Sequence, residues 1–422
     1  MDKFVVSGRT RLEGSVEAAG SKNAALPMMV AALLAKGASH LGRVPRLRDV
    51  RTMARLLETL GTRVTPEGNH LTVDASALTS VEAPYDLVKT MRASIYVLGP
   101  LLAREGRARV SLPGGCAWGP RPVNLHLQGM KALGAKVEIE GGYVVASCPD
   151  GLRGADIVLD IPSVGATGNL MMAATAAKGT TRIQNAAREP EMPALAAWLG
   201  AMGARIEGAG TSEIVIQGGA PLRAAEGDVI PDRIEAGTFL VGGVLTEGDV
   251  TVTRCAPGHL TALLAKLRET GAEITQGADW IRVRGASRPA AVKITTDFHP
   301  GFPTDLQAQM MALASVADGT SVITEQVYHD RFTHVGELAR LGADIDLDNN
   351  VAVVRGKPRL SGARVMATDL RASAALILAG FAAEGETHVS RVYHIDRGYE
   401  RIEAKLAALG GVVRRENEPL VT

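Results

Sequence analysis

The chain has 422 residues, enough for two or three domains that each bury a core of their own. Hydrophobic residues make up 46% and charged residues 22%, as is usual for a soluble globular protein. The formal net charge of +1 argues against a general affinity for nucleic acid or for an anionic membrane surface.

Cysteine usage and the first residues bear on the cellular compartment. The three cysteines are widely spaced and form no C-x-x-C pair, so neither a disulfide framework nor a zinc site is predicted. The N-terminus lacks the apolar stretch of a secretion signal. The longest apolar run, residues 24–35, is too short to span a bilayer and contains Pro27. These features predict a soluble, cytoplasmic protein.

The same local pattern recurs six times along the chain. In each copy a helix ends at a glycine and a strand follows, with spacings of 73, 69, 68, 71 and 68 residues between successive glycines. A glycine directly after an apolar-periodic run is the expected helix C-cap, because it adopts the left-handed conformation at little cost. These glycines are Gly61, Gly134, Gly203, Gly271, Gly342 and Gly410. A second series of helix-ending glycines keeps the same phase at Gly37, Gly106, Gly179, Gly248, Gly319 and Gly385.

Each copy is predicted to fold as strand, helix, strand, helix, strand, strand. Copies four and five end in clear strands, whereas the sixth stops at Thr422 without one. The first residues, Phe-Val-Val-Ser-Gly at 4–8, have the missing pattern and no preceding copy. We therefore expect the N-terminal strand to complete the sixth copy, so that both termini share a domain. The alternative is a frayed N-terminal strand.

A short polar segment opens the first helix of each copy. Helix N-termini carry free N–H groups and a partial positive charge, so they suit phosphates and carboxylates. Lys22, Arg92 and Arg371 lie in three of these segments and would strengthen that preference. Each of them could instead be a solvated cation at a helix end. Their recurrence at equivalent places favours anion binding.

Two further arginines follow strands, Arg331 in His-Asp-Arg-Phe-Thr-His and Arg397 in His-Ile-Asp-Arg-Gly-Tyr. Each could bind an anion, or could form a structural ion pair with the aspartate before it. The histidines at 329 and 334 are five residues apart, which does not fit a helical two-ligand metal site.

Residues 111–123 read Ser-Leu-Pro-Gly-Gly-Cys-Ala-Trp-Gly-Pro-Arg-Pro-Val, which is too rich in glycine and proline for a regular element. The pattern predicts a loop that carries Cys116 and Arg121. Neighbouring glycines and a cation favour a reactive thiol, although a free cysteine is more often inert packing. The loop lacks the Lys-Ser/Thr of a phosphate-binding loop, and no dinucleotide-binding fingerprint follows a strand.

Taken together, these residues resemble the UDP-N-acetylglucosamine 1-carboxyvinyltransferases of the enolpyruvyl transferase family, and the resemblance runs through most of the chain. It is carried by Gly-Ser-Lys-Asn-Ala-Ala-Leu-Pro from residue 20, Pro-Tyr-Asp-Leu-Val-Lys-Thr-Met-Arg-Ala-Ser from 84, Pro-Gly-Gly-Cys from 113, Gly-Pro-Arg-Pro-Val from 119, Asn-Ala-Ala-Arg-Glu-Pro-Glu from 185, Phe-Pro-Thr-Asp from 302, Ala-Thr-Asp-Leu-Arg-Ala-Ser from 367 and Tyr-His-Ile-Asp-Arg-Gly-Tyr-Glu-Arg-Ile from 393.

The resemblance implies an α/β fold, a two-domain inside-out α/β barrel built from six repeats of the strand-helix-strand-helix-strand-strand unit. The first domain would cover residues 22–229 with three repeats and carry the Cys116 loop. The second would join residues 1–21 to residues 230–422. The active site is expected between the domains, with the loop closing over it.

The reaction implied by the resemblance is transfer of the enolpyruvyl group of phosphoenolpyruvate to the 3-hydroxyl of UDP-N-acetylglucosamine, with release of phosphate. It is the first committed step of peptidoglycan precursor synthesis and proceeds through a tetrahedral ketal, without a metal or cofactor. Asp305 would take the hydroxyl proton, and Cys116 would protonate the methylene carbon. Cys116 could also form a covalent phospholactoyl adduct and react with a fosfomycin-type inhibitor. These acid and nucleophile roles require opposite thiol protonation states, and both stay open.

The resemblance also implies two sets of binding residues, because the charge of phosphoenolpyruvate must be neutralised as it redistributes. Family positions around phosphoenolpyruvate match Lys22, Asn23, Arg121, Arg331, Asp369, Arg371 and Arg397, of which Lys22 and Arg397 are also expected to be catalytic. Positions around UDP-N-acetylglucosamine match Asn23, Arg92, Arg121, Pro122, Val123, Asn124, Leu125, Ser163, Val164, Gly165, Asp305 and Val327.

Two departures from the family pattern and two alternatives remain. Trp118 stands where the loop usually has a smaller aliphatic residue, and Ile161 with Pro162 replaces a stretch that often carries a lysine near the uridine diphosphate. One alternative is enolpyruvyl transfer to shikimate 3-phosphate on the same fold. The other is a non-catalytic repeat protein that binds nucleotide sugars.

Overall fold

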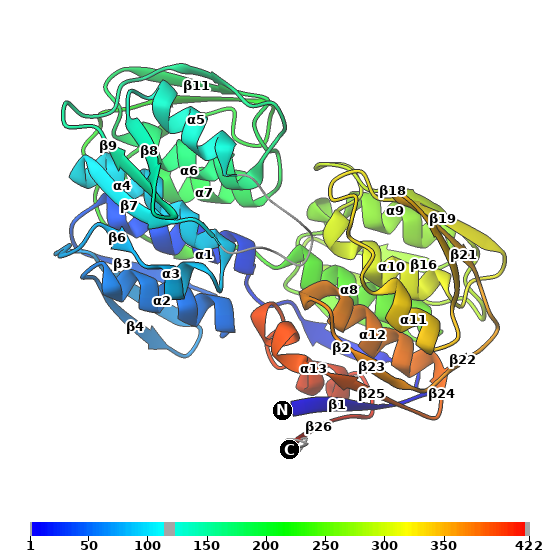
Figure 1. Cartoon of the computed structure of the whole chain (residues 1–422). Coiled ribbons are helices and arrows are strands. Elements are labelled where there is room, and N and C mark those ends of the chain that lie inside the picture. The colour runs from blue at the N-terminus through cyan, green and yellow to red at the C-terminus, as the bar shows by residue number, and fades with distance from the viewer. Residues whose placement is uncertain (1, 114–122, 418–422) are drawn as a thin grey trace. The chain divides into compact units, whose positions relative to one another are not determined.

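The computed structural model describes residues 2–113 and 123–417 (Figure 1). The chain divides into two compact units. The first unit spans Gly20–Ile230, and the second joins Met1–Ala19 to Pro231–Thr422. Each unit has a hydrophobic core of its own, and among the described residues no buried apolar side chain belongs to both cores.

The described residues of the first unit form three four-stranded sheets. In spatial order their strands are β14 (Glu226–Asp228), β3 (Ala38–Gly42), β5 (His70–Asp74) and β4 (Arg63–Glu67); β6 (Glu82–Ala83), β7 (Arg107–Ser111), β9 (Tyr143–Ser147) and β8 (Lys136–Glu140); and β10 (Asp156–Val158), β11 (Thr180–Gln184), β13 (Glu213–Gln217) and β12 (Arg205–Glu207).

The described residues of the second unit also form three four-stranded sheets, with a small two-stranded sheet beside them. The strands of the larger sheets are β2 (Glu13–Glu17), β15 (Asp249–Thr253), β17 (Trp280–Arg284) and β16 (Glu273–Gln276); β18 (Lys293–Thr295), β19 (Thr320–Thr324), β21 (Val351–Arg355) and β20 (Asp344–Asp348); and β23 (Arg364–Met366), β25 (Glu386–Ser390), β1 (Asp2–Ser7) and β26 (Val413–Asn417). The small sheet pairs β22 (Leu360–Ser361) with β24 (Ala383–Glu384).

The six larger sheets share one topology. An edge strand pairs in parallel with the second strand, which pairs antiparallel with the third, and the third pairs antiparallel with the fourth, as in β18, β19, β21 and β20. In five of these sheets the third and fourth strands form a hairpin. Two edge strands pair with strands that are far away in the sequence. β2 precedes the first helix but pairs with β15, and β14 follows the third repeat but pairs with β3. In the last sheet β1 lies between β25 and β26, with Phe4 opposite both Val389 and Arg415.

Helices fill the space between these sheets. In the first unit they are α1 (Lys22–Ala31), η1 (Ala32–Leu34), α2 (Arg48–Thr59), α3 (Tyr85–Val88), η2 (Arg92–Val97), α4 (Leu98–Glu105), α5 (Asn124–Ala132), α6 (Val164–Thr175) and α7 (Glu191–Ala201), where η marks a 3-10 helix. In the second unit they are α8 (Arg233–Leu245), η3 (Pro257–His259), α9 (Thr261–Glu269), η4 (Thr304–Leu306), α10 (Gln307–Ala314), α11 (Val335–Arg340), α12 (Leu370–Ala382), η5 (Val392–Arg397) and α13 (Ile402–Ala408).

Three helices of the second unit, α8, α10 and α12, pack against one another amid its strands (Figure 1). Almost every residue of these helices is buried, as expected for a helix that is apolar on all sides. The surrounding strands bury alternate side chains and expose the others. Gly242 allows α8 to approach α12 closely, because a Cβ there would lie 2.9 Å from Leu378 Cδ2. Helices inside and sheets outside make each unit an inside-out α/β barrel.

The helix-ending glycines have the predicted conformation at every expected position except Gly248. The other eleven have φ values between 66° and 110°. At the exception, Glu247 takes the left-handed conformation with φ 53°. Gly248 is required for a different reason, since a Cβ there would lie 2.0 Å from the carbonyl oxygen of Leu12.

Candidate active site

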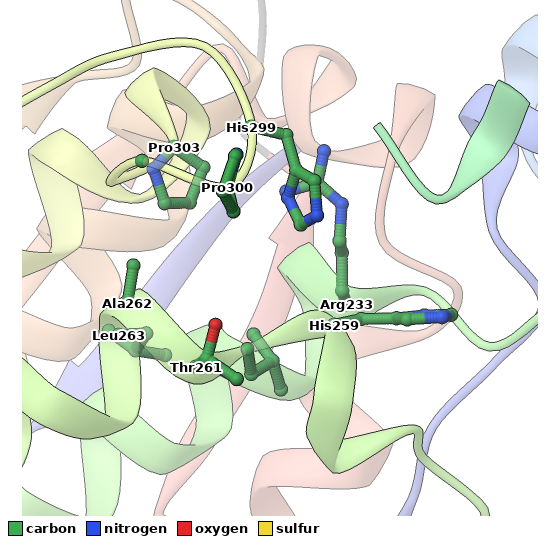
Figure 2. Close-up of a pocket in the computed structure, with 10 residues that line it drawn as sticks. Arg233, His259, Thr261, Ala262, Leu263, His299, Pro300 and Pro303 are labelled. Carbon is green, nitrogen blue, oxygen red and sulfur yellow. The ribbon is translucent and has the colours of Figure 1, made fainter. Parts of the chain in front are cut away.

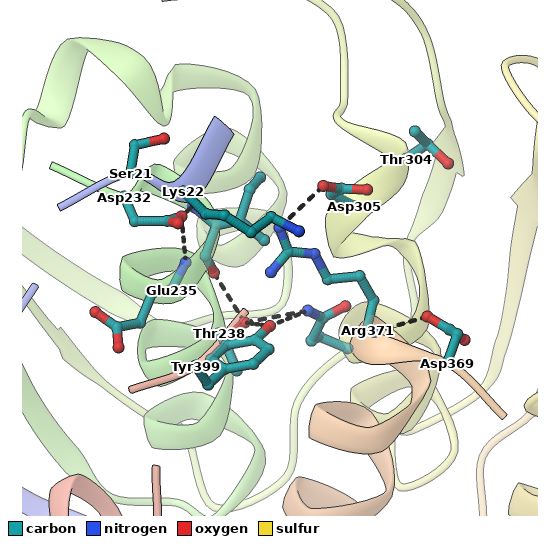
Figure 3. Close-up of polar contacts among 12 residues, drawn as sticks. Ser21, Lys22, Asp232, Glu235, Thr238, Thr304, Asp305, Asp369, Arg371 and Tyr399 are labelled. Atoms are coloured by element: carbon teal, nitrogen blue, oxygen red, sulfur yellow. Dashed lines mark hydrogen bonds and ion pairs between the residues drawn. The ribbon is translucent and has the colours of Figure 1, made fainter. Parts of the chain in front are cut away.

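Asp305 lies in the 3-10 turn η4, directly before α10, and its carboxylate is held between two arginines. Arg331 Nη1 is 2.8 Å from Asp305 Oδ1. Arg371 Nη2 is 3.0 Å from Asp305 Oδ2, and Figure 3 shows this pair. The arginine side chains are 8% and 2% exposed, whereas that of Asp305 is 27% exposed. The carboxylate is therefore fixed in direction and still open to a molecule outside the protein.

Electrostatics at this cluster favour the charged forms of all three groups. Burial works against the charge of Arg371, but Asp305 and the phenol oxygen of Tyr399 outweigh it and raise its pKa. Burial likewise opposes the charge of Arg331, while Asp305 and Asp369 raise its pKa. Two guanidinium groups within ion-pair distance in turn stabilise an ionised Asp305.

Asp369 is the N-cap of α12 and brings a second carboxylate to the cluster. Its Oδ1 accepts hydrogen bonds from the backbone N–H groups of Arg371 at 2.7 Å and Ala372 at 3.3 Å. Burial raises the pKa of Asp369, and Arg331 opposes that rise. This cap fixes the first turn of α12, from which the Arg371 side chain extends toward Asp305.

A buried cluster of polar side chains packs against Arg371. Its guanidinium lies over the ring of Tyr399, 5.4 Å from the centroid. The Thr238 hydroxyl donates to the carbonyl of Ile234 at 2.8 Å, so the Tyr399 hydroxyl donates to Thr238 Oγ1 at 2.9 Å. Gln309 Nε2 donates to both oxygens, at 3.1 and 3.2 Å. Hydrogen bonds thus hold Tyr399 to α8 and α10, and its ring packs against the guanidinium of Arg371 on α12.

Lys22 and Asn23 open α1 in the first unit. The backbone N–H of Ala24 donates to the hydroxyl of the N-cap Ser21, and the Lys22 ammonium lies 3.2 Å from Asp49 Oδ2 on α2. Both charged side chains are nearly buried, at 10% and 5% exposure. The Asp49 carboxylate therefore helps to fix the direction of the Lys22 side chain.

Several of the described residues predicted to bind UDP-N-acetylglucosamine lie near His126 on α5. Val123 is the N-cap of α5 and Ser163 is the N-cap of α6. The first turn of α6 lies against the imidazole, since a Cβ on Gly165 would be 3.1 Å from His126 Nε2. Burial, and secondarily the charge of Arg92, lowers the pKa of His126 to about 4.

His126 is therefore neutral, and its tautomer is set by Asn169. The amide nitrogen of Asn169 lies 3.0 Å from His126 Nδ1 and also donates to the carbonyl of Ile95, so Nδ1 accepts. Nε2 then carries the proton of the neutral ring. Asn169 Oδ1 accepts from the backbone N–H of Gly99, which joins η2, α4, α5 and α6 through one amide.

The remaining predicted residues have different outcomes. Cys116, Arg121, Pro122 and Trp118 lie outside the described residues. The backbone N–H of Val327 donates to the carboxylate of Glu325 at 2.9 Å. Arg397 ends η5 and is half-buried, and the neighbouring Asp396 binds Arg415 with both oxygens. Arg331 pairs with Asp305 and with Thr304, which argues against the alternative that it serves a local pair with Asp330.

A small hollow lies next to the Asp305 segment (Figure 2). Its walls come from Arg233 at the start of α8, from the η3–α9 segment with His259, and from the 299–303 loop with His299 and Pro303. Pro303 precedes Thr304 and Asp305 directly, so this wall continues into the carboxylate cluster.

Sequence reasoning missed three residues that organise these clusters: Glu325, Tyr399 and His126. Tyr399 stands inside the matched motif Arg-Gly-Tyr-Glu-Arg-Ile, and Glu325 is an acid directly after the apolar strand β19. His126 follows the predicted loop by three residues of helix. Each signal was visible in the sequence, but their partners come from distant segments.

Across residues 2–113 and 123–417, three or more His, Cys, Asp or Glu side chains do not gather in a way that could hold a metal ion. No helix within that part of the chain is long and apolar enough to cross a membrane.

Solved structures of other proteins share this architecture. The solved structure of the enolpyruvyl transferase NikO from Streptomyces tendae matches with a TM-score of 0.89 and 28% identity, over 99% of both chains. EPSP synthase from Acinetobacter baumannii matches with a TM-score of 0.79 and 18% identity, over 99% of this chain and 100% of that one, which is a likeness of fold alone. The fold is that of the two-domain α/β enolpyruvyl transferases, which confirms the predicted fold class.

The sequence comparisons define the family more narrowly. Residues 6–406 match the family model described as EPSP synthase (3-phosphoshikimate 1-carboxyvinyltransferase). The UDP-N-acetylglucosamine 1-carboxyvinyltransferase of Trichlorobacter lovleyi is 55% identical over 99% of this chain and 100% of its own length. That of Anaeromyxobacter dehalogenans is 57% identical over 98% and 99%. The chain belongs to the UDP-N-acetylglucosamine 1-carboxyvinyltransferases, within the enolpyruvyl transferase family, as the motifs predicted.

Proposed function

We propose that this chain transfers the enolpyruvyl group of phosphoenolpyruvate to the 3-hydroxyl of UDP-N-acetylglucosamine and releases phosphate, in the cytoplasm, as the first committed step of peptidoglycan precursor synthesis. The observation that carries the proposal is the Asp305 carboxylate, ion-paired on both sides and partly exposed. Relatives with that activity in their names are 55–57% identical over nearly the whole chain, which does not favour shikimate 3-phosphate as the acceptor.

In this proposal Asp305 is the base. As the sugar oxygen bonds to C2 of phosphoenolpyruvate, the hydroxyl proton passes to the carboxylate, and C3 gains a proton from an acid, the role proposed for Cys116. In the second half C3 loses a proton, the double bond re-forms and the C2–O bond to phosphate breaks. A carboxylate that is oriented by Arg331 and Arg371 suits proton transfer, because its lone pairs already point in a fixed direction and the side chain need not rearrange.

The cations divide between the two units in this proposal. Arg331, Arg371 and Arg397 of the second unit would bind the anionic groups of phosphoenolpyruvate, together with Lys22 and Arg121 of the first. Buried arginines with raised pKa values keep their charge throughout the reaction, so they can neutralise the phosphate as it leaves.

The acceptor would be held mainly by the cluster around His126. The N-termini of α5 and α6 present free N–H groups there, and Arg92 adds a positive charge. These features support binding of the diphosphate of a nucleotide sugar. Cys116, as the proposed acid, would also be the group that a fosfomycin-type epoxide alkylates.

The deciding experiment is phosphate release from phosphoenolpyruvate, measured with UDP-N-acetylglucosamine, with shikimate 3-phosphate and with neither acceptor. We expect release with the nucleotide sugar alone, and a product whose mass equals the sugar nucleotide plus an enolpyruvyl group. Release that depends on shikimate 3-phosphate would reverse the assignment. Binding of UDP-N-acetylglucosamine without turnover would support the non-catalytic alternative.

A further inference from the structure

Glu325 is a fully buried carboxylate that the reaction scheme does not use. It follows β19 directly and is 0% exposed. Its Oε1 accepts hydrogen bonds from Thr296 Oγ1 at 2.7 Å and from the backbone N–H groups of Val327 and Tyr328, both at 2.9 Å. Its Oε2 accepts from Thr304 Oγ1 at 2.8 Å. Four donors converge on one carboxylate, which satisfies a buried acceptor-only group.

The direction of these hydrogen bonds is fixed by the number of protons available. Thr304 has a single hydroxyl proton, and a carboxylate can only accept, so that proton points at Glu325. The Thr304 oxygen is then free to accept, and Arg331 Nη1 donates to it at 3.0 Å. The same Nη1 lies 2.8 Å from Asp305 Oδ1. Arg331 is therefore held between Asp305 directly and Glu325 through Thr304.

The same carboxylate fixes three positions of the candidate site. Thr304 directly precedes Asp305 in η4 (Figure 3), so the Thr304–Glu325 bond ties this turn to the end of β19. The bonds to Val327 and Tyr328 hold the backbone of the segment that continues to Arg331. Asn350 strengthens the anchor, because its side chain donates to the Glu325 carbonyl at 3.0 Å.

We propose that Glu325 and Thr304 are positioning residues for the transfer reaction. The Thr304 hydroxyl connects the Glu325 carboxylate to Arg331 through two hydrogen bonds, and this connection directs Arg331 toward Asp305. Glu325 also orients the Val327 backbone. This proposal rests on the proposed function, in which Asp305 is the base and Arg331 binds phosphoenolpyruvate. Neither Glu325 nor Thr304 needs to touch a substrate.

The test compares two substitutions that differ by the hydroxyl group. Thr304→Val keeps the shape of the side chain and removes this connection, which leaves Arg331 Nη1 and Glu325 Oε2 each short of one partner. We expect kcat to fall at least tenfold and the Kd for phosphoenolpyruvate to rise severalfold, while the Kd for UDP-N-acetylglucosamine changes less than threefold. Thr304→Ser retains the hydroxyl and should restore both values to within about threefold of the original chain.

Thr296→Val is the matched control, because Thr296 also donates to Glu325 but has no hydrogen bond to Arg331 among those described. It should lower the thermal unfolding midpoint about as much as Thr304→Val and leave kcat and phosphoenolpyruvate binding near their original values. Glu325→Gln should impair both catalysis and UDP-N-acetylglucosamine binding, since it disturbs Thr304 and Val327 together.

The proposal is overturned if Thr304→Val retains kcat and phosphoenolpyruvate affinity within twofold, or if Thr304→Ser is as impaired as Thr304→Val. Equal losses of activity in Thr296→Val and Thr304→Val would also overturn it, because they would indicate general loosening. If the unaltered chain binds phosphoenolpyruvate but does not turn over UDP-N-acetylglucosamine, the proposed function fails. In that case calorimetric measurement of phosphoenolpyruvate binding by the same variants still tests whether Thr304 and Glu325 position Arg331.

Discussion

Asp305 illustrates how far single residues could be predicted. The motif Phe-Pro-Thr-Asp and its resemblance implied its place before a helix and cations in its surroundings. The identity of its partners did not follow, because Arg331 lies beyond the next strand of the same repeat and Arg371 in the following repeat, and both meet Asp305 only in the folded unit. The Tyr399 hydroxyl, buried with Thr238 and Gln309, was equally hidden, since its role depends on three helices packing together.

Replacing Asp305 by Asn should separate binding from chemistry. Asn cannot accept a proton from the sugar hydroxyl, so we expect kcat to fall by about 10²–10⁴-fold, while the Kd for UDP-N-acetylglucosamine stays within about fivefold. Steady-state phosphate release and calorimetry measure the two quantities. Asp318→Asn, at an exposed pair with Arg288, is the control and should leave kcat unchanged.

A rate for Asp305→Asn within twofold of the original would exclude Asp305 as the base. The thermal unfolding midpoint must be measured in parallel, because the change leaves two buried guanidinium groups without their shared carboxylate.

At the scale of the elements, the repeat pattern predicts best those features that depend on neighbouring residues alone. Helix ends followed from glycines that tolerate positive φ, and the exception at Gly248 has a tertiary cause in the carbonyl of Leu12. The pairing of β2 with β15 and of β14 with β3 has no local signal, because any edge strand of this length could pair with either sheet. Periodicity identifies a strand, but not its neighbour.

Two glycines of the first unit provide a matched test of this local cause. Gly134 ends α5 with φ 94°, Gly200 lies within α7, and a Cβ on either would meet no atom within 4 Å. Gly134→Ala should therefore destabilise the first unit by about 1 kcal/mol, through backbone strain alone. Gly200→Ala should stabilise it by about 0.5–1 kcal/mol.

Urea unfolding followed by circular dichroism measures both glycine variants. If Gly134→Ala were neutral or stabilising, the left-handed conformation at this helix end would not be what requires glycine there.

At the scale of the whole molecule, each unit has one deeply buried neutral histidine. His126 of the first unit has a pKa lowered to about 4 by burial and by Arg92, and His334 of the second has a pKa lowered to about 3 by burial and by Arg331. In the unfolded chain both would titrate near 6.5. Below that pH the unfolded chain binds protons that the folded chain does not, so both units should lose stability on acidification.

The expected loss begins as the pH falls below 6.5 and continues until the folded-state pKa is reached; above 6.5 the contribution is complete. At pH 5 each histidine should cost on the order of 2 kcal/mol relative to pH 8. Urea unfolding across this range, with His126→Gln and His334→Gln, should show a flatter pH dependence for each variant than for the original chain. Parallel curves for all three proteins would contradict the assignment.

The position of β1 between β25 and β26 also bears on synthesis of the chain on the ribosome. β1 leaves the exit tunnel long before its partner strands, which begin at Glu386 and Val413, have been translated. Residues 20–230, in contrast, contain all strands of their own three sheets and can fold while the rest is still being made. The N-terminal segment must therefore stay unpaired through most of translation, and an early stop codon would leave the second unit with an open sheet edge.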